Sequence, residues 1–266
     1  MRLLKLVGPN EFSLVQVPTH NTLPYVILSH TWTHSQEVTY QDLISGGGKS
    51  KTGYNKIKFC GEQATKDGFL YFWVDTCCIY KSNPNELATA INSMFRWYRN
   101  AKKCYVYLAD VSTPGDDADL QAYQTIWEAA FRKSRWFTRG WTLQELIAPD
   151  IVEFFSKEGR LLGNKTSLEM PIHEITGIPF KALQGNPFSD FNIDERREWA
   201  AERQTTEQED LLYCLLGLCE VSMPPIYGEG KEAALKRLQM TVRGFSKSSE
   251  PKDPKGMSFL MPFRLN

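Results

Sequence analysis

Four runs of hydrophobic residues alternate with segments of helical periodicity over the first 156 residues. The runs are 25–29 (YVILS), 69–75 (FLYFWVD), 104–111 (CYVYLADV) and 151–156 (IVEFFS). They are rich in β-branched and aromatic residues, and an unbroken hydrophobic run is typical of a strand that is buried on both faces of a sheet. We therefore expect four buried strands, of which 25–29 is the first.

Helical signals lie between these runs. A helix is expected near 54–67, after the polar stretch 44–53. The next begins after Asn83, which can act as the N-cap, because Pro84 stands at the first helical position and Glu86 three residues after the cap. Strands that alternate with helices indicate a mainly parallel, doubly wound α/β sheet with right-handed crossovers.

The last third of the chain has a different pattern. It reads as mostly helical, with a capping-box pattern at Thr206 and Glu209 and a Pro/Gly-rich break at 222–230. From about residue 244 the sequence becomes polar and resembles a linker. We expect an α/β core at about 24–156, a helical extension at about 160–243, and a linker or tail at 244–266.

The segment 134–150 (SRWFTRGWTLQELIAPD) carries the first candidate for chemistry. A helix that starts at Gly140 places Leu143, Leu146 and Ile147 on one side. Trp141 and Glu145, four residues apart, then share the opposite side. A carboxylate next to an indole, turned away from the hydrophobic stripe, either faces solvent or lines a pocket.

The ends of the expected strands collect further polar groups. In open α/β sheets, ligands bind outside the carboxyl ends of the strands. Ser29, His30, Asp75 and Asp110 lie at such ends, which would bring hydroxyl, imidazole and carboxylate groups to one edge. Each of these residues is equally suited to capping a turn, so we leave both interpretations open.

Composition narrows the class of protein. The 266 residues are 42% hydrophobic, enough for one large folded core, and the formal net charge of zero gives no general attraction to nucleic acid or to an anionic membrane. No hydrophobic run has the length of a membrane span or of a signal-peptide core. We therefore expect a soluble, cytoplasmic protein.

Cysteine and histidine spacing gives no sign of a metal site. The six cysteines lie in hydrophobic runs without C-x-x-C pairs, and the four histidines show no ligand spacing. We expect buried, reduced thiols and no metal. The GGGKS stretch is not a P-loop, because position 43, where the motif needs glycine, is Leu43.

Five fragments, in order along residues 24–240, together resemble the fungal heterokaryon incompatibility (HET) domain. They are PYVILSHTW, YFWVDTCCI, ELATAINSMFRWYRNAKKCYVYLADV, SRWFTRGWTLQELIAP and RQTTEQEDLLYCLLGLCEVSMPPIYGEGKEAALKRLQ. The resemblance implies a HET domain at about 1–243 that induces cell death when genetically different fungal cells fuse. It also implies self-association, and a fused or separate receptor with a nucleotide-binding oligomerisation domain. The given chain would then be the effector part of a longer protein.

A second resemblance, to TIR domains, implies a flavodoxin-like sheet and an activity. YVILSHTW, KDGFLYFWVD and GWTLQEL are similar to TIR segments, and in enzymatic TIR domains the glutamate of the last segment cleaves the nicotinamide–ribose bond of NAD. The corresponding residue here is Glu145. The residues 30–32 depart from the TIR pattern, and the helical region 190–243 has no TIR counterpart.

These resemblances imply a site in which Glu145 is catalytic and NAD, or a related nucleotide, is the substrate, without a separate cofactor. Breaking the bond builds positive charge on the ribose while nicotinamide leaves as a neutral base, so one carboxylate could suffice. Trp32 or Trp141 would stack on a ring, and Arg135 or Arg139 would meet the pyrophosphate. The substrate-binding residues expected on this basis are Ser29, His30, Trp32, Asp75, Arg139 and Trp141. The alternative is a non-enzymatic death adaptor whose surface recruits partners and in which Glu145 only orders the site. Hydrolysis and cyclisation of NAD both stay open.

Overall fold

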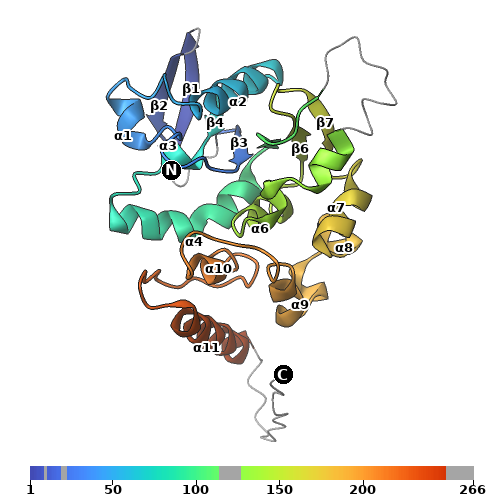
Figure 1. The fold of residues 1–266 in the computed structure, drawn as a ribbon. Coiled ribbons are helices and arrows are strands. Elements are labelled where there is room, and N and C mark those ends of the chain that lie inside the picture. The colour runs from blue at the N-terminus through green and yellow to red at the C-terminus, as the bar shows by residue number, and fades with distance from the viewer. Residues whose placement is uncertain (9–10, 19–22, 114–126, 250–266) are drawn as a thin grey trace, which may run out of the picture.

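A seven-stranded sheet forms the centre of the computed structural model, which describes residues 1–8, 11–18, 23–113 and 127–249, the last five by backbone only. The strand order is β2-β1-β4-β3-β5-β6-β7 (Figure 1). The strands are β1 (Arg2–Gly8), β2 (Glu11–Gln16), β3 (Tyr25–His30), β4 (Tyr71–Trp73), β5 (Cys104–Tyr107), β6 (Val152–Phe155) and β7 (Leu161–Asn164).

The four central strands are parallel, as the hydrophobic runs predict. In the register of the sheet, Ile27 lies opposite both Trp73 of β4 and Cys104 of β5, and Val106 of β5 lies opposite Phe154 of β6. All residues of β3 and β5 are buried. Three strands are shorter than predicted. Asp75 already belongs to the short helix α3 (Asp75–Cys78), β5 ends at Tyr107, and β6 loses one residue at each end.

The edges of the sheet correct the sequence-based picture. The first strand is not 25–29, because the antiparallel hairpin β1–β2 precedes it and β1 pairs antiparallel with β4. At the other edge β7, inside the region expected to be helical, pairs antiparallel with β6. The hairpin and β7 escape prediction because they are only partly buried and have no continuous hydrophobic run. The sheet is therefore mixed, with a parallel centre.

Helices cover both faces of this sheet (Figure 1). On one side lies α2 (Tyr54–Lys66), where Gly61 packs against Phe12 and Phe72. On the other side lies α4 (Pro84–Asn100), capped by Asn83 as predicted, and its Tyr98 hydroxyl donates to the Leu28 carbonyl at 3.0 Å. The remaining elements of the core are α1 (Tyr40–Ile44), a helix at 127–132, the 3₁₀ helix η1 (Arg135–Thr138) and α6 (Thr142–Ile147).

The C-terminal extension forms a further layer, below α4 in Figure 1. Beyond β7, all the regular elements in the described part of the chain are helical. They are α7 (Glu169–Thr176), α8 (Phe180–Leu183), η2 (Phe188–Asp190), α9 (Ile193–Glu198), α10 (Asp210–Tyr213) and α11 (Lys231–Ser249). The helix α11 thus runs into the expected linker at 244–266, of which 250–266 lie outside the described residues.

The extension packs directly against α4. The Asn92 side chain donates to the Met223 carbonyl at 3.1 Å and accepts from the Met223 amide at 2.9 Å. All six cysteines are buried and free, as expected. Among the helices of the described segments, none combines the length and the hydrophobicity needed to cross a membrane.

Gly217 offers a test of this packing. A Cβ atom at position 217 would lie 2.1 Å from the Cβ of Phe95 on α4. We expect Gly217→Ala to reduce the free energy of unfolding by about 1–3 kcal/mol, as overpacking of a core does. The measurement is urea denaturation. Gly244→Ala is the control, because nothing lies within 4 Å of its Cβ and alanine favours the helix α11. Equal stability of the two variants would contradict the tight contact.

Candidate functional site

Glu145 lies in a helix that has no solvent-facing side. All six residues of α6 are buried, including Leu143, Leu146 and Ile147 as predicted, and Glu145 is only 7% exposed. The expectation that its side of the helix faces solvent or an open pocket is not met. The extension covers this helix as well, since Gln144 Nε2 donates to the Cys214 carbonyl at 2.7 Å.

Ser29 and Glu145 meet at the carboxyl end of β3, as the sequence analysis expects. The Ser29 hydroxyl, which is completely buried, donates to Glu145 Oε2. Trp136 Nε1 in turn donates to Ser29 Oγ at 2.7 Å. Sequence reasoning overlooked Trp136 because the helical spacing drew attention to Trp141. Its place in the same segment, shortly before the predicted helix, was the available signal.

Burial controls the charge of this glutamate. Loss of solvent raises the pKa of Glu145 from 4.5 to about 8, the hydrogen bond from Ser29 opposes this increase, and the nearby charge of Asp75 adds to it. At pH 7 the side chain is therefore mainly a neutral carboxylic acid. A carboxyl group with such a pKa, held by a hydroxyl at a strand end, is typical of functional sites, although ion-pair networks also perturb pKa values.

His30 and Asp75 form a second cluster. Successive residues of a strand point to opposite faces, so Ser29 faces Trp136 and α6 while His30 faces Asp75 and Glu37. His30 Nε2 is 3.1 Å from Asp75 Oδ1, and His30 Nδ1 is 3.6 Å from Glu37 Oε2. Burial alone would raise the pKa of Asp75, but the charge of Lys81 and the hydrogen bond with His30 hold it well below its usual value.

Trp32 is the exposed part of this cluster. Its residue surface is 45% exposed, and the Lys81 ammonium lies 3.6 Å from the centre of its ring and 3.1 Å from Asp75 Oδ2. Arg135 Nη2 donates to the Trp32 carbonyl at 2.6 Å. By contrast, Asp110 accepts from Ser134 Oγ and from the Arg135 amide, which is a turn-capping role.

Trp141 and Arg139 are bound to the extension. Trp141 Nε1 donates to Asp210 Oδ2 at 2.9 Å, and Arg139 Nη2 donates to Thr206 Oγ1 at 3.3 Å. Both side chains are half-buried. Arg139 is nevertheless within electrostatic reach of Glu145, although the main effect on its own pKa is a decrease caused by burial. The structure thus joins Ser29 to Glu145 and His30 to Asp75, and it gives Trp141 a different partner.

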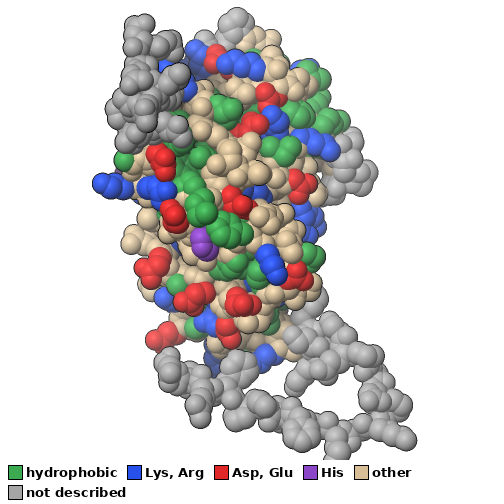
Figure 2. Space-filling model, turned by 90° about the vertical axis from the view of Figure 1, so that its right-hand side faces the viewer, with side chains coloured by type: hydrophobic (Ala, Val, Ile, Leu, Met, Phe, Trp, Pro, Cys, Tyr) green, Lys and Arg blue, Asp and Glu red, His purple; other side chains and the backbone are tan. Residues whose placement is uncertain are grey.

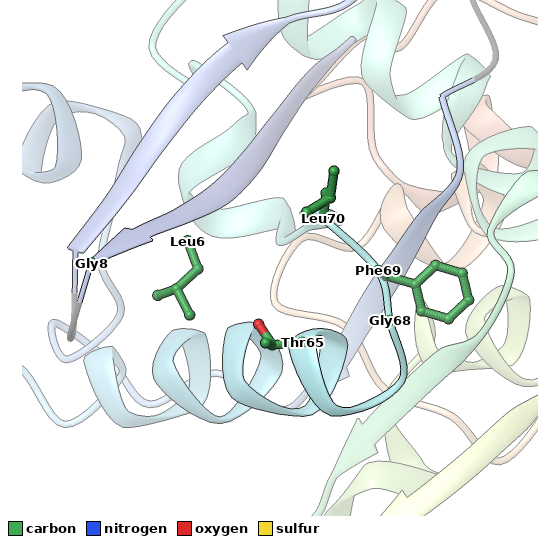
Figure 3. Close-up of a pocket in the computed structure, with 6 residues that line it drawn as sticks. All are labelled: Leu6, Gly8, Thr65, Gly68, Phe69 and Leu70. Carbon is green, nitrogen blue, oxygen red and sulfur yellow. The ribbon is translucent and has the colours of Figure 1, made fainter.

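Two surface hollows lie away from these clusters. One, of 390 Å³, is lined by Leu6, Gly8, Thr65, Gly68, Phe69 and Leu70, and it opens between β1 and the end of α2 (Figure 3). Its lining side chains carry a single hydroxyl and no titratable group. The other, of 270 Å³, is lined by Asn55, Lys58, Phe59, Glu62, Gln63, Lys66, Tyr107, Lys157, Glu158 and Gly159. Glu145 lines neither hollow.

The surface carries no single-sign field on the side that is shown in Figure 2. Lysine and arginine side chains alternate there with acidic ones, around a strip of hydrophobic side chains. Within the described residues, no group of three or more His, Cys, Asp or Glu side chains is arranged to hold a metal ion.

The fold and the site define a class: an α/β domain with a buried, hydrogen-bonded glutamate at the carboxyl edge of its parallel strands, closed by a helical extension. Residues 25–130 match the family model for heterokaryon incompatibility protein (HET). The chain is also 56% identical over 244 residues to vegetative incompatibility protein HET-E-1 of Podospora anserina. The chain therefore carries a domain of the HET family.

That alignment covers 91% of this chain but 18% of the relative, so the chain spans less than a fifth of the relative's length. No solved structure matches the chain significantly.

The raised pKa of Glu145 predicts a pH-dependent stability. The folded protein keeps this proton up to about pH 8, whereas the unfolded chain releases it near 4.5. Deprotonation between these values favours the unfolded chain, so the stabilising effect of the proton is lost as pH rises through this window. Glu145→Gln cannot titrate, so the melting temperature of this variant should rise relative to that of the parent between pH 5 and pH 8. A constant difference over this range would mean that Glu145 has an ordinary pKa.

Proposed function

We propose that this chain is a cell-death effector module of vegetative incompatibility that cleaves the nicotinamide–ribose bond of NAD, with Glu145 as the catalytic carboxylate. The family match and the printed name of the relative support the incompatibility role. The observation that carries the chemistry is the buried pair of Ser29 and Glu145 at the carboxyl edge of the parallel strands. This is the edge at which open α/β sheets bind their ligands.

The strand order supports the link to TIR-like enzymes. Numbered along the chain, the four parallel strands lie in the order second, first, third, fourth. This is the beginning of the flavodoxin-like order 2-1-3-4-5. The antiparallel hairpin at one edge and β7 at the other are additions to that plan. On this basis we place the flavodoxin-like core and the reaction in the same part of the domain, about residues 24–156.

The proposed reaction needs Glu145 in its ionised form. As the bond between nicotinamide and ribose breaks, its electron pair stays on the nicotinamide nitrogen and positive charge develops on the ribose. The carboxylate stabilises this charge, and Ser29 keeps the carboxylate in place by donating to Oε2. Water then adds to the ribose and releases a proton, which gives ADP-ribose. Attack by a base of the same nucleotide would give a cyclic product instead.

Trp32 and Lys81 supply the accessible part of the proposed site. The exposed indole could stack on a ring of the nucleotide, and Lys81 brings a positive charge beside it. His30 and Asp75 hold this region together through their contact at 3.1 Å. We retain Arg139 as a candidate for the pyrophosphate and assign Trp141 to the support of α6.

Access to Glu145 is the step that we assign to assembly. The glutamate is 7% exposed and mainly neutral at pH 7, so we expect a single protomer to be inactive. Self-association in the cytoplasm, driven by a fused or separate nucleotide-binding oligomerisation receptor, would move α6 and open the site. The effector would be residues 1–243, with further domains after the tail in a longer protein.

One observation favours a second function, that of a non-enzymatic death adaptor. Glu145 is buried and accepts a hydrogen bond from Ser29, and a structural carboxyl group would show the same arrangement. In that case the surface of the domain would recruit partners, and NAD would play no part.

Release of nicotinamide from NAD by clustered protein separates these two functions. We expect Glu145→Gln to lower the rate by about 10²-fold or more, because it removes the charge that stabilises the ribose cation. The control is Glu209→Gln, a buried glutamate that accepts from the amides of Gly228 and Gly230. Loss of activity with retained killing in cells would favour the adaptor, and full activity of Glu145→Gln would exclude this glutamate as the catalytic group.

The pKa of Glu145 also predicts the pH profile of the reaction. Only the ionised form stabilises the ribose cation, so the rate at saturating NAD should rise with pH and level off above about pH 8. The measurement is nicotinamide release by the clustered parent between pH 5.5 and about 9. A rate that is flat over this range would mean that assembly restores an ordinary pKa or that another group acts.

A further inference from the structure

Arg203 is a buried cation in the segment between α9 and α10. It is 5% exposed, and its Nη1 donates to the Arg139 carbonyl at 2.9 Å and to Thr142 Oγ1 at 2.8 Å. Its Nε donates to the Trp199 carbonyl at 3.2 Å, and Nη2 has no hydrogen-bond partner among the described residues. Burying a charge costs several kcal/mol unless other groups compensate for it. Its partners are neutral oxygens, so the role of this charge needs an explanation.

Arg203 contacts a ring that includes Glu145 and consists of three hydrogen bonds together with the covalent chain that links their residues. Thr142 Oγ1, which accepts from Arg203, shares its single proton between the Trp136 carbonyl at 2.6 Å and the Arg139 carbonyl at 2.8 Å. The Trp136 indole donates to Ser29, and Ser29 donates to Glu145. Since Thr142 and Glu145 belong to the same turn of α6, the ring returns to its starting point. Arg203 therefore contacts the ring at the residue that begins the helix.

The backbone around Arg203 is held against the same turn. The Gln204 amide donates to the Thr138 carbonyl at 2.6 Å, and the Gly140 amide donates to the Gln204 carbonyl at 2.9 Å. A Cβ at Gly140 would lie 2.5 Å from Thr205 Cγ2, so the two segments touch closely. The extension is thus locked to the start of α6 by main chain as well as by the Arg203 side chain.

We infer that Arg203 is a positioning residue for Glu145: it holds the first turn of α6, and with it the carboxyl group, through its hydrogen bond to Thr142. Its effect on catalysis rests on the proposed NAD cleavage, whereas its effect on the ionisation of Glu145 does not. The inference gives the helical extension, which has no counterpart in TIR domains, a role in the active site.

The electrostatics agree with this geometry. Burial lowers the pKa of Arg203 to about 10, so the guanidinium stays charged at pH 7, and its charge opposes the rise in the pKa of Glu145 that burial causes. Asp75 acts in the opposite direction. The titratable groups that interact with Glu145 from the surrounding elements are Asp75 of α3, Tyr98 of α4, Cys104 of β5, Arg139 before α6, and Arg203.

Two substitutions separate charge from geometry. Arg203→Gln keeps a hydrogen-bond donor and removes the charge, whereas Arg203→Lys keeps the charge and loses the planar fork. The matched control is Arg196→Gln, since Arg196 is also a buried arginine of the extension and donates to the Leu218 carbonyl at 2.6 Å. Each variant is also combined with Glu145→Gln, which cannot titrate. The difference in melting temperature between the variant with and without Glu145→Gln, measured against pH, then reports the titration of Glu145.

We expect Arg203→Gln to move the Glu145 titration to higher pH, while Arg203→Lys and Arg196→Gln leave it in place. In nicotinamide release by clustered protein, both Arg203 variants should lower kcat by about 10- to 100-fold with little change in KM. Full parental kcat in Arg203→Lys, or an unmoved titration in Arg203→Gln, would overturn the inference.

These readouts distinguish two failures. If the clustered parent releases no nicotinamide, the proposed function fails, and the melting-temperature titration still tests the effect of Arg203 on Glu145. If Arg203→Gln does not fold, the kcat of Arg203→Lys tests the inference. Arg196→Gln then shows how much stability the loss of a buried arginine costs by itself.

Discussion

The hydrogen bond from Ser29 to Glu145 ties the sheet to the helix α6, and the positions of both depend on it. Ser29 belongs to the central strand of the sheet, and Glu145 belongs to a short helix that the extension covers. A carboxyl group in such surroundings is stable only with a hydrogen-bond partner or in its neutral form. Both conditions are met, because Ser29 donates to Glu145 and burial raises its pKa to about 8.

The hydrogen bond between Ser29 and Glu145 also fixes how the end of β3 is used. Because Ser29 and His30 are adjacent in β3, they serve opposite faces. Ser29 receives the Trp136 indole, whereas His30 contacts Asp75 at 3.1 Å. The two faces nevertheless interact electrostatically, since the negative charge of Asp75 contributes to the raised pKa of Glu145. What the sequence presents as one collection of polar residues is therefore two clusters that interact through the strand end.

The extension completes the domain. It binds α4 through Asn92 and Met223, and the turn before α6 through Arg203 and Gln204. A short helix such as α6 has little stability of its own, because six residues cannot offset the cost of helix nucleation. Its position, and with it the position of Glu145, depends on the layers on either side.

Local patterns determined the central part of this protein. Continuous hydrophobic runs identified the four parallel strands, and the residues at Asn83 and Pro84 marked the start of α4, because burial on both faces and helix capping leave their signature within a few residues of the chain. The strands β1, β2 and β7 left no such signature, since partly buried strands at or next to an edge of the sheet tolerate mixed residues.

The site was likewise determined partly by local sequence patterns and partly by the tertiary structure. The helical spacing and the family resemblance pointed to Glu145, and the strand ends pointed to Ser29, His30 and Asp75. Only the tertiary structure decided that Glu145 is buried, that Trp136 and not Trp141 joins its hydrogen-bond ring, and that Arg203 lies beneath it. Exposure, pKa and partner choice depend on residues that are far apart along the chain, and no local pattern records which of them will meet.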